Sequence, residues 1–297
     1  MRLAIIGFGE VGRCYARALH DAGFELLLCE QRPSASALDI SAEWALPLHS
    51  APGAWLCDAD WVISCVTGAH ALPVLEQCAQ HLKPGAGFAD FTTASPEVKR
   101  RAARAASAAG LRYVDTAIMG AITLNWVRTP LLAAGDGATD LKDIVDKAGG
   151  RVQVIKGGSA GDAISLKVLR SVFTKGMEAL TVELLTSAEK QGVREELYQQ
   201  LDDIDHTPLR DFLEMLVRTH VVHAKRRAHE VHDAQQELAA QGLISVVLPG
   251  VEEKFLDTAQ KLEQGGLDNP HPSIEQALAW LLAHTSSPST NLNRVHL

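Results

Sequence analysis

The sequence has few cysteines and no long apolar run, and these shortages exclude two classes of protein. The cysteines are five in number and form no CxxC pair, so we read them as small buried side chains in a reducing compartment rather than as a disulfide framework: Cys14, Cys29, Cys57, Cys65 and Cys78. No apolar run approaches the roughly 18 residues that a membrane-spanning helix needs, and the first residues, MRLAIIGFG, form no charged and apolar leader. We therefore expect a cytoplasmic protein with no membrane partner.

Positive charge is also scarce. The chain carries 28 Lys and Arg against 36 Asp and Glu, a formal net charge of −8. The basic residues are scattered except in two short clusters, Lys99–Arg104 and Lys225–Arg227, which we interpret as solvated helix faces. This distribution excludes nucleic acid as a partner. A small acidic substrate would need local positive charge in its pocket, because the overall field of the protein repels it.

The first half of the chain alternates short apolar runs with helical stretches, which is the pattern of a parallel sheet covered by helices. The predicted strands are Leu3–Ile6, Glu25–Cys29, Trp61–Val66, Gly87–Phe91, Tyr113–Ala117, Leu131–Gly135 and Val152–Ile155. The helices predicted between them include Gly12–Ala22, His70–His81 and Pro96–Ala109. This order predicts an α/β protein whose amino-terminal domain is a Rossmann-type, doubly wound sheet.

The second half changes character after Gly157 and Gly158, because apolar residues then recur at helical spacing. Ser159 and Asp162 resemble a capping box that opens a long helix, from about Gly161 to Gln191. We predict an NAD(P)-binding domain over residues 1–160 and an all-helical substrate and dimerisation domain over 161–297. A helix of this length exceeds the needs of one small core, so we expect it to link the domains and pack against a second subunit, giving a homodimer or higher homo-oligomer. The polar tail after His284 is either an ordered arm or disordered.

A glycine-rich turn follows the first predicted strand directly. Gly7, Gly9 and Gly12 form G-x-G-x-x-G between RLAII and the helical run VGRCYARALHDAG. The first glycine permits the tight turn, the second lets the backbone approach a pyrophosphate, and the third allows the helix to pack closely on the strand. A turn that only reverses the chain is the alternative. In this context we expect a dinucleotide site.

The end of the second predicted strand bears on which dinucleotide binds. Glu30 follows the loop by about 20 residues, where a carboxylate accepts hydrogen bonds from the ribose hydroxyls and repels a 2′-phosphate. Arg32 could clamp that phosphate if Glu30 turned away, or could be a solvated loop residue. NAD is therefore the expected cofactor, with NADP as the alternative.

Four segments together resemble a known family. GFGEVG, DFTTASP at 90–96, VDTAIMGA at 114–121 and GGSAGDAISLKVLRS at 157–171 occur in the order and spacing of the β-hydroxyacid dehydrogenases, which include 3-hydroxyisobutyrate and 6-phosphogluconate dehydrogenases. The resemblance covers essentially the whole chain. The runs KVLRSVFTKGMEAL and AKRRAHEVHDAQQELAAQGL look more like a less characterised branch with its own carboxyl-terminal helical domain.

The resemblance implies roles for individual residues of this chain. It places Gly7, Phe8, Gly9, Glu10, Val11 and Gly12 at the pyrophosphate, Glu30 at the adenine ribose, Val66 and Thr67 beside the nicotinamide, and Thr93 at the nicotinamide ribose. Lys167 falls on the family's catalytic lysine. Two departures concern the substrate: Met119 and Ala121 stand where the family has serine and a second glycine, and Ser171 replaces an asparagine.

The residues around Lys167 support a catalytic reading independently. Lys167, Ser171, Thr174 and Glu178 form one polar stripe on a largely apolar helix. A partly desolvated lysine has a lowered pKa, which suits a general acid and base, although a solvated or ion-paired lysine is the commoner case. Ser171 either orients the substrate or packs the helix. The candidate substrate contacts are Met119, Gly120, Arg170 and Thr174, although Arg170 and Lys175 could equally form surface pairs.

Other polar residues give weaker indications. His220, His223, His229 and His232 repeat an HxxH spacing, but no third ligand is well placed, so we expect no metal site. A histidine reaching a neighbouring subunit's pocket is the alternative. Asp115 is either a second acid or a residue that holds a turn.

The sequence as a whole predicts an NAD(P)-dependent dehydrogenase that acts on the CH–OH group of a small acidic molecule. We expect its active site at the carboxyl ends of the strands, in the cleft between the domains. Reduction of an imine with the same cofactor is one alternative, although Lys167 stands where imine reducers more often present an acid. A nicotinamide-binding regulator without turnover is the other.

Overall fold

The structure, a computed structural model, describes residues 1–267 and 269–285. The chain divides into two compact units, Met1–Phe173 and Thr174–Leu297. Their boundary falls within the long helix α7 (Asp162–Gln191), whereas the sequence analysis placed the domain boundary before that helix. The first turns of α7 therefore belong with the first unit.

The first unit is built on one eight-stranded sheet in the order β3-β2-β1-β4-β5-β6-β7-β8. The strands are β1 (Arg2–Ile6), β2 (Glu25–Cys29), β3 (Leu48–His49), β4 (Trp61–Ser64), β5 (Gly87–Asp90), β6 (Arg112–Ile118), β7 (Leu131–Ala134) and β8 (Val152–Val154). All seven predicted strands are present, each with ends shifted by no more than a few residues. The short edge strand β3, which pairs with the end of β2, is the addition.

Two strands, β7 and β8, run against the expected direction. β7 pairs with β6 in antiparallel fashion, with Ile118 opposite Leu131, while the other neighbours are parallel. The connection between them holds only the short helices α5 (Ile122–Asn125) and η3 (Trp126–Arg128). A parallel return needs a crossover that runs back along the sheet, usually a full helix. The predicted doubly wound fold is confirmed, with this correction.

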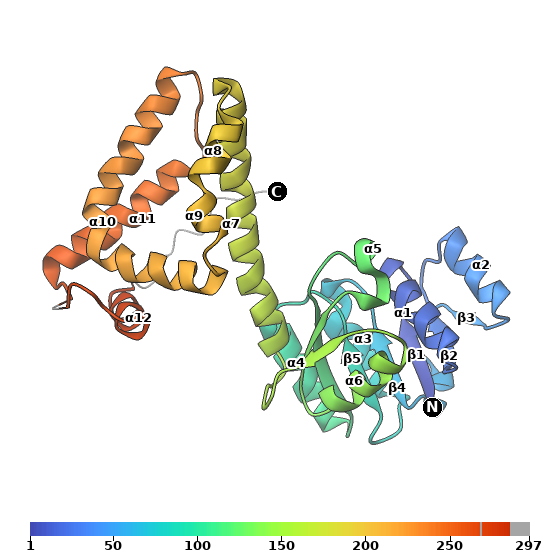
Figure 1. Cartoon of the computed structure of the whole chain (residues 1–297). Helices are drawn as coiled ribbons and strands as arrows, with labels where there is room; N and C mark the ends of the chain where they lie inside the picture. The colour runs from blue at the N-terminus through green and yellow to red at the C-terminus, as the bar shows by residue number, and fades with distance from the viewer. Residues whose placement is uncertain (268, 286–297) are drawn as a thin grey trace. The chain divides into compact units, whose positions relative to one another are not determined.

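Helices cover both faces of the sheet (Figure 1). Leu3 and Ile5 of β1 pack toward α1 (Glu10–Asp21) and α6 (Ala138–Lys147). Ala4 and Ile6 pack toward α3 (Ala71–Ala79) and α4 (Pro96–Ala108). Successive side chains of a strand point to opposite faces, so a strand that is buried on both faces is a continuous apolar run. This explains why the short apolar runs of the sequence located the strands.

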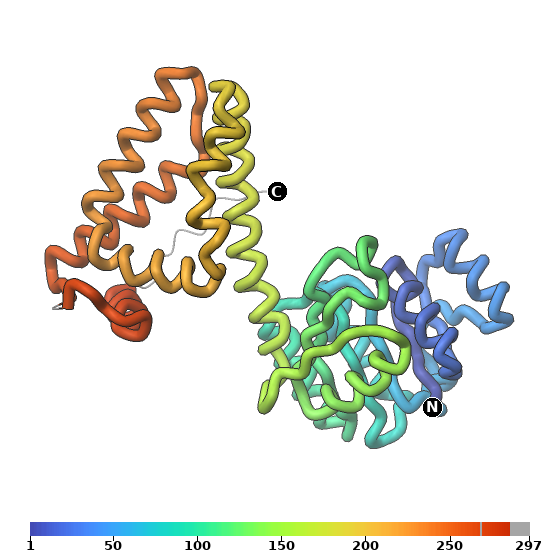
Figure 2. Tube along the Cα trace, in the orientation of Figure 1, coloured from blue at the N-terminus to red at the C-terminus, as the bar shows by residue number. Residues whose placement is uncertain are grey.

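The described secondary-structure elements of the second unit are all helices (Figure 2). It contains the rest of α7, then α8 (Arg194–Gln200), α9 (Asp202–Asp205), α10 (Leu209–Ala240), α11 (Leu248–Gln264) and α12 (Ile274–Ala283). Val221, Ala277 and Trp280 form a small core, and the Trp280 Nε1–H donates to the Gly265 carbonyl at 2.8 Å. The prediction of an all-helical second part is confirmed.

Helix α7 agrees closely with its predicted bounds. It begins at Asp162, and the Asp162 carboxylate accepts from the Ser159 N–H at 2.8 Å, which is one half of the predicted capping box. Toward its end, Glu183 accepts from the N–H groups of Val246 and Val247 at 2.8 and 3.2 Å. Glu183 therefore ties the later part of α7 to the start of α11. The polar tail that the sequence analysis considered lies, from residue 286 on, outside the described residues.

The cysteines are all free, and one of them differs from expectation. Cys14, Cys29 and Cys78 are buried, and burial raises the pKa of the Cys14 thiol to about 11. Cys57 is exposed, so the reading of all five as buried is wrong at this position. It lies in the short helix η1 (Ala54–Asp58), where Leu56 takes the inward position. Among the described helices, none is both long and apolar enough to cross a membrane.

We predict that Leu28→Ala lowers the free energy of unfolding by about 2 to 5 kcal/mol, because the removed methyl groups leave a cavity in the core beneath α1. Leu28, on β2, is fully buried in this core. The control is Leu38→Ala on α2 (Ala35–Glu43), a leucine that is 52% exposed and whose loss should cost less than about 1 kcal/mol. Urea unfolding followed by tryptophan fluorescence measures both, and equal losses would contradict this packing.

Candidate functional site

The carboxyl ends of four neighbouring strands meet at one edge of the sheet. Ile6 of β1 pairs with Cys29 of β2 and with Ser64 of β4, and Ser64 pairs with Asp90 of β5. The loops that follow these strand ends carry the residues predicted from the sequence to contact the cofactor: Gly7, Phe8, Gly9, Glu10, Val11, Gly12, Glu30, Arg32, Val66, Thr67 and Thr93. The fold thus brings these segments to the edge where doubly wound proteins bind nucleotides.

The glycine turn after β1 has the shape that a pyrophosphate requires. Gly7 has φ +88°, and a Cβ on Gly12 would lie 1.9 Å from the Gly7 carbonyl oxygen, so both positions need glycine. Gly9 has open space around it and precedes α1 with no side-chain cap. The first N–H groups of α1 are therefore open to an anion. These residues fit a dinucleotide phosphate.

The Glu30 carboxylate is fixed at the end of β2 by two backbone N–H groups. Its Oε2 accepts from Phe8 N–H at 2.7 Å and its Oε1 from Arg32 N–H at 3.0 Å. The glutamate therefore stands directly beside the glycine turn, while the Arg32 residue is exposed. Nearby, the Arg13 guanidinium donates to the Phe8 carbonyl and the Ser34 hydroxyl, both at 3.2 Å. This end of β2 is thus held to the turn from both sides.

The loops after β4 and β5 contact each other. A Cβ on Gly68 would lie 3.0 Å from the Ala94 N atom, which shows how closely the two backbones approach. Thr67 shares a hydrogen bond of 2.8 Å with His70 Nδ1, and Val66 is partly buried. Thr93 is exposed on the neighbouring loop. The structure brings Val66, Thr67 and Thr93 together at the edge next to the glycine turn.

Lys167 lies near the start of α7, within the first unit. Its side chain is partly buried, and this burial lowers the pKa of Lys167 below its usual value, with the positive charge of Lys99 lowering it further. Arg170, Ser171 and Thr174 follow on the same helix at exposed positions. Of these, Thr174 is the first residue of the second unit.

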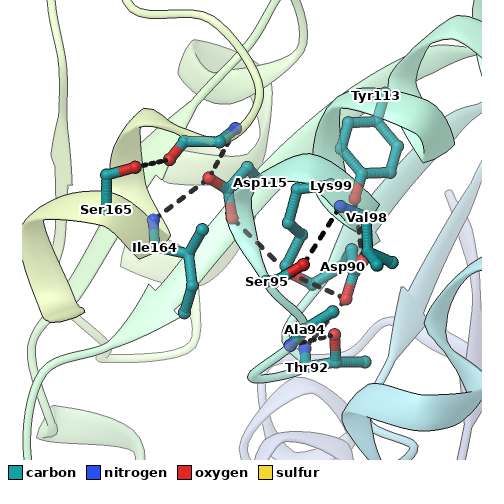
Figure 3. Close-up of polar contacts among 11 residues, drawn as sticks. Asp90, Thr92, Ala94, Ser95, Val98, Lys99, Tyr113, Asp115, Ile164 and Ser165 are labelled. Carbon is teal, nitrogen blue, oxygen red and sulfur yellow. Dashed lines mark hydrogen bonds and ion pairs between the residues drawn. The ribbon is translucent and has the colours of Figure 1, made fainter. Parts of the chain in front are cut away.

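A second, fully buried lysine acts on Lys167 and was not predicted from the sequence. Lys99 of α4 is fully buried, so its interpretation as part of a solvated face is wrong, although Arg100 and Arg104 of the same cluster are exposed and pair with Glu97. The Lys99 Nζ lies 3.0 Å from an Asp90 carboxylate oxygen and donates to the Asp90 carbonyl at 2.7 Å (Figure 3). The available signal was helical spacing, since positions 99, 102 and 106 form the buried face of α4.

Asp115 joins this cluster to the lysine-bearing helix. One of its oxygens lies 3.4 Å from Lys99 Nζ, and the other accepts from the N–H groups of Gly161 and Ile164 at 3.0 and 3.1 Å. Burial raises the pKa of the Asp115 carboxyl, although Lys99 and the two N–H groups oppose that effect. The sequence left Asp115 as either a second acid or a residue that holds a turn, and these hydrogen bonds fit the second role. Asp115 anchors the first turn of α7.

The predicted substrate loop follows β6. Met119 packs against a small cluster that contains Leu132 of β7 and Ala163 of α7, and Gly120 is exposed. Met119 therefore lies close to the first turn of the helix that carries Lys167. The structure places this loop beside the anchored end of α7.

Two of the four histidines of α10 bond to polar side chains. His220 Nε2 shares a hydrogen bond of 2.9 Å with Thr258, and His232 Nδ1 lies 3.1 Å from a Glu252 oxygen. Within the described ranges, no three His, Cys, Asp or Glu side chains gather as metal ligands would.

The strand order, the glycine turn and the carboxylate at the end of β2 define a dinucleotide-binding domain of the doubly wound class. Residues 2–157 match the family described as the NAD binding domain of 6-phosphogluconate dehydrogenase, and the chain belongs to that family. Residues 188–262 match a second family, a domain of unknown function. The predicted resemblance, including a separate carboxyl-terminal domain, is confirmed.

Comparisons over the whole chain agree with this assignment. An uncharacterised 28.5 kDa protein of Methanothermus fervidus is 27% identical over 255 residues, which cover 86% of this chain and 98% of the relative. A solved conserved protein of unknown function, described as structurally similar to 3-hydroxyacid dehydrogenases, is 27% identical with a TM-score of 0.62, covering 90% of this chain and 100% of its own. An imine reductase variant from Myxococcus stipitatus in complex with NAD⁺ has a TM-score of 0.75 at 15% identity, covering 94% and 99%. That last likeness concerns the fold alone.

We predict that the two glycines of the turn respond differently to alanine. Gly12→Ala should lower both the stability and the NADH affinity, because its Cβ would meet the Gly7 carbonyl. Gly9→Ala should leave the unfolding midpoint unchanged and weaken NADH binding by tenfold or more, an effect of about 1.4 kcal/mol, because the open space there is where the phosphate approaches. Fluorescence titration and thermal unfolding separate the two effects. Undiminished NADH binding by Gly9→Ala would place the cofactor elsewhere.

Proposed function

We propose that this chain is an NAD(P)-dependent oxidoreductase that interconverts a small, acidic hydroxy compound and its carbonyl form, with Lys167 as general acid and base. The single observation that carries the proposal is the position of Lys167. It is a partly buried lysine on a helix that Asp115 anchors to β6, beside the end of β5. The loop after β5 carries Thr93 and lies at the same edge of the sheet as the glycine turn. The family of the first unit and the hydroxyacid dehydrogenase-like fold support the same reaction class.

Lys167 supplies the proton transfer that the reaction needs. A bound nicotinamide accepts or returns hydride at its C4 atom. When an alcohol is oxidised, its hydroxyl proton must also leave, and the neutral Lys167 amine takes it; in the reductive direction the ammonium returns it. A lysine with a lowered pKa has more of its neutral form near neutral pH. Ser171, one turn further along α7, would orient the substrate oxygen.

The substrate contacts of this proposal come from two segments. Met119 and Gly120 contribute the loop after β6, and Arg170 and Thr174 contribute the helix face near Lys167. The chain as a whole is acidic, so the positive charges of Lys167 and Arg170 supply the local attraction that an acidic substrate needs. A guanidinium also binds a carboxylate through two parallel hydrogen bonds.

The contacts of Glu30 favour NAD over NADP. Two backbone N–H groups hold its carboxylate at the end of β2, where it would accept hydrogen bonds from the adenine ribose and repel a 2′-phosphate. The exposed guanidinium of Arg32 is the group that would favour NADP.

Two other functions remain as competitors. Imine reduction is favoured by the fold shared with an imine reductase, and a basic lysine at the proton-transfer position argues against it. A regulator that binds the cofactor without turnover is favoured by the apolar contacts of Met119, which stands where the related dehydrogenases carry a hydroxyl.

We further propose that the protein is cytoplasmic and at least a homodimer. The support for an oligomer is the exposed apolar surface of α7, which includes Leu169 at 65%, Val172 at 68% and Val182 at 62% exposed. An exposed apolar surface that follows one long helix is typical of an interface.

Lys167→Met tests the catalytic assignment. We expect kcat to fall by about 10² to 10⁴-fold, the usual contribution of a general acid and base, with the affinity for NADH unchanged. In the native protein, the rate of alcohol oxidation should rise with pH through the Lys167 pKa. Because that pKa is lowered, the rise should be centred below the ordinary value of 10.5. NADH consumption against a panel of small oxoacids, aldehydes and cyclic imines provides the assay.

Lys147→Met is the matched control, because Lys147 is an exposed lysine in the last turn of α6. It should leave kcat, the NADH affinity and the pH profile unchanged. Full activity of Lys167→Met would refute the lysine mechanism. Binding of NADH without turnover on the whole panel would favour the regulator, and consumption confined to imines would favour the reductase.

Glu30→Gln tests the cofactor preference. We expect the ratio of the NADPH to the NADH dissociation constant to fall by about tenfold, a change of about 1.4 kcal/mol, because the charge that repels a 2′-phosphate is removed. Glu25→Gln is the control, since Glu25 begins the same strand and pairs with Arg2 at the exposed end. If the native protein preferred NADPH, Arg32 rather than Glu30 would be the residue that determines cofactor choice, by binding the 2′-phosphate.

A further inference from the structure

We propose that Lys99 is a positioning residue for the proton-transfer step: through Asp115 and Asp90 it fixes the first turn of α7, and so Lys167, relative to the loop that would hold the nicotinamide ribose. This inference rests on the proposed function. It concerns a residue that touches neither substrate nor cofactor in that proposal. Figure 3 shows Lys99 between the two aspartates, with the start of α7 on the far side of Asp115.

The first half of the link that Lys99 makes runs through Asp115 to α7, the helix that carries Lys167. Lys99 Nζ lies 3.4 Å from one Asp115 oxygen, and the other oxygen accepts from the Gly161 and Ile164 N–H groups. Lys167 follows Ile164 by less than one helical turn. A displacement of the Asp115 carboxylate would therefore move Lys167 with the helix.

The second half runs from Lys99 to the loop after β5. Lys99 Nζ lies 3.0 Å from Asp90 Oδ1, and the same oxygen accepts from the Thr92 N–H at 2.8 Å. The Thr92 hydroxyl in turn accepts from the Ala94 N–H at 3.2 Å. Thr93, the predicted nicotinamide ribose contact, lies between these two residues. One cation thus links this loop and the lysine helix.

The side chains of this cluster are shielded from solvent, so their polar atoms depend on one another for hydrogen bonds and ion pairs. The side chains of Lys99 and Asp115 are fully buried, and that of Asp90 is 1% exposed. Tyr113 completes the cluster by donating its hydroxyl to Asp90 at 2.7 Å. Replacing a buried ion pair with apolar side chains of similar volume is often neutral or stabilising, whereas removing one partner leaves an uncompensated charge. Stability alone therefore gives little reason for a lysine at this position.

The charge of Lys99 also acts on Lys167 directly. The titratable groups around Lys99 are Asp90 and Asp115, which it contacts, Tyr113, which bonds to Asp90, and Lys167 on α7. The positive charge of Lys99 lowers the pKa of Lys167, in addition to the effect of burial. Removing Lys99 should therefore raise the pKa of Lys167. Neutralising Asp115 should lower the Lys167 pKa, because the positive charge of Lys99 then loses one of the two carboxylates that compensate it.

This opposition provides a test that a purely structural role would fail. We expect Lys99→Met and Asp115→Asn each to reduce kcat by about 10²-fold, the effect of a displacement of about 1 Å at the reacting groups. Lys99→Met should move the rising limb of the oxidation profile to higher pH, and Asp115→Asn should move it to lower pH, each by about half a pH unit. Arg104→Met, an exposed position on the same helix α4, is the control and should change neither quantity.

A second measurement reads Lys167 without turnover. Reductive methylation of the full chain with ¹³C-formaldehyde labels the lysines, and the signal missing from the Lys167→Arg protein identifies Lys167 in an NMR titration. The same opposite shifts should appear in this titration. NADH titration of each variant checks that the first unit is folded.

The outcomes separate this inference from the proposed function. If Lys167→Met loses turnover while Lys99→Met keeps the native kcat and pH profile, the role of Lys99 is refuted and the proposed function stands. If Lys167→Met keeps full turnover, the proposed function fails, whereas opposite NMR shifts would still support the link between Lys99 and Lys167. Shifts of the same sign in both variants would show a general loss of packing and would overturn the proposal.

Discussion

A charged amine is costly to bury unless anions compensate it, and the buried lysine of α4 is compensated by two aspartates on adjacent strands. Because β5 and β6 are in register at Asp90 and Asp115, the two carboxylates lie side by side and Lys99 can contact both. The spare oxygen of Asp115 then accepts from the first turn of α7. These charges thus hold the start of the long helix against β6.

The features that could be predicted from the sequence are those with a local cause. The strands are continuous apolar runs, so their positions follow from composition, and the glycine turn is complete within residues 7–12. The direction of β7 could not be predicted, because an apolar run has no direction and the length of its connection decides the pairing. The two-residue strand β3 is too short to leave a pattern.

The same limit applied to the candidate site: its local motifs could be predicted, and its long-range contacts could not. Lys167 and the loops at the strand ends belong to recognisable motifs, and the fold places the loops at one edge. The anchor at Asp115 could not be predicted, because its partner Gly161 is separated from it by 46 residues and the contact exists only in the folded chain. Lys99 was obscured by its basic neighbours, which are exposed. A buried charge on an alanine-rich helix becomes visible only when its spacing is compared with the buried alanines.

The antiparallel pairing of β7 has a consequence for how this protein could acquire new substrates. A parallel connection would leave the carboxyl end of β6 and return along the sheet, whereas a hairpin keeps residues 119–130 at the edge where the cofactor loops lie. This hairpin carries the exposed side chains of Leu124 and Trp126. A change in its length or composition would alter the short helices α5 and η3 but none of the strands and none of the buried charges. Substrate selectivity can therefore diverge through residues 119–130 while the loops that would bind the cofactor stay unchanged.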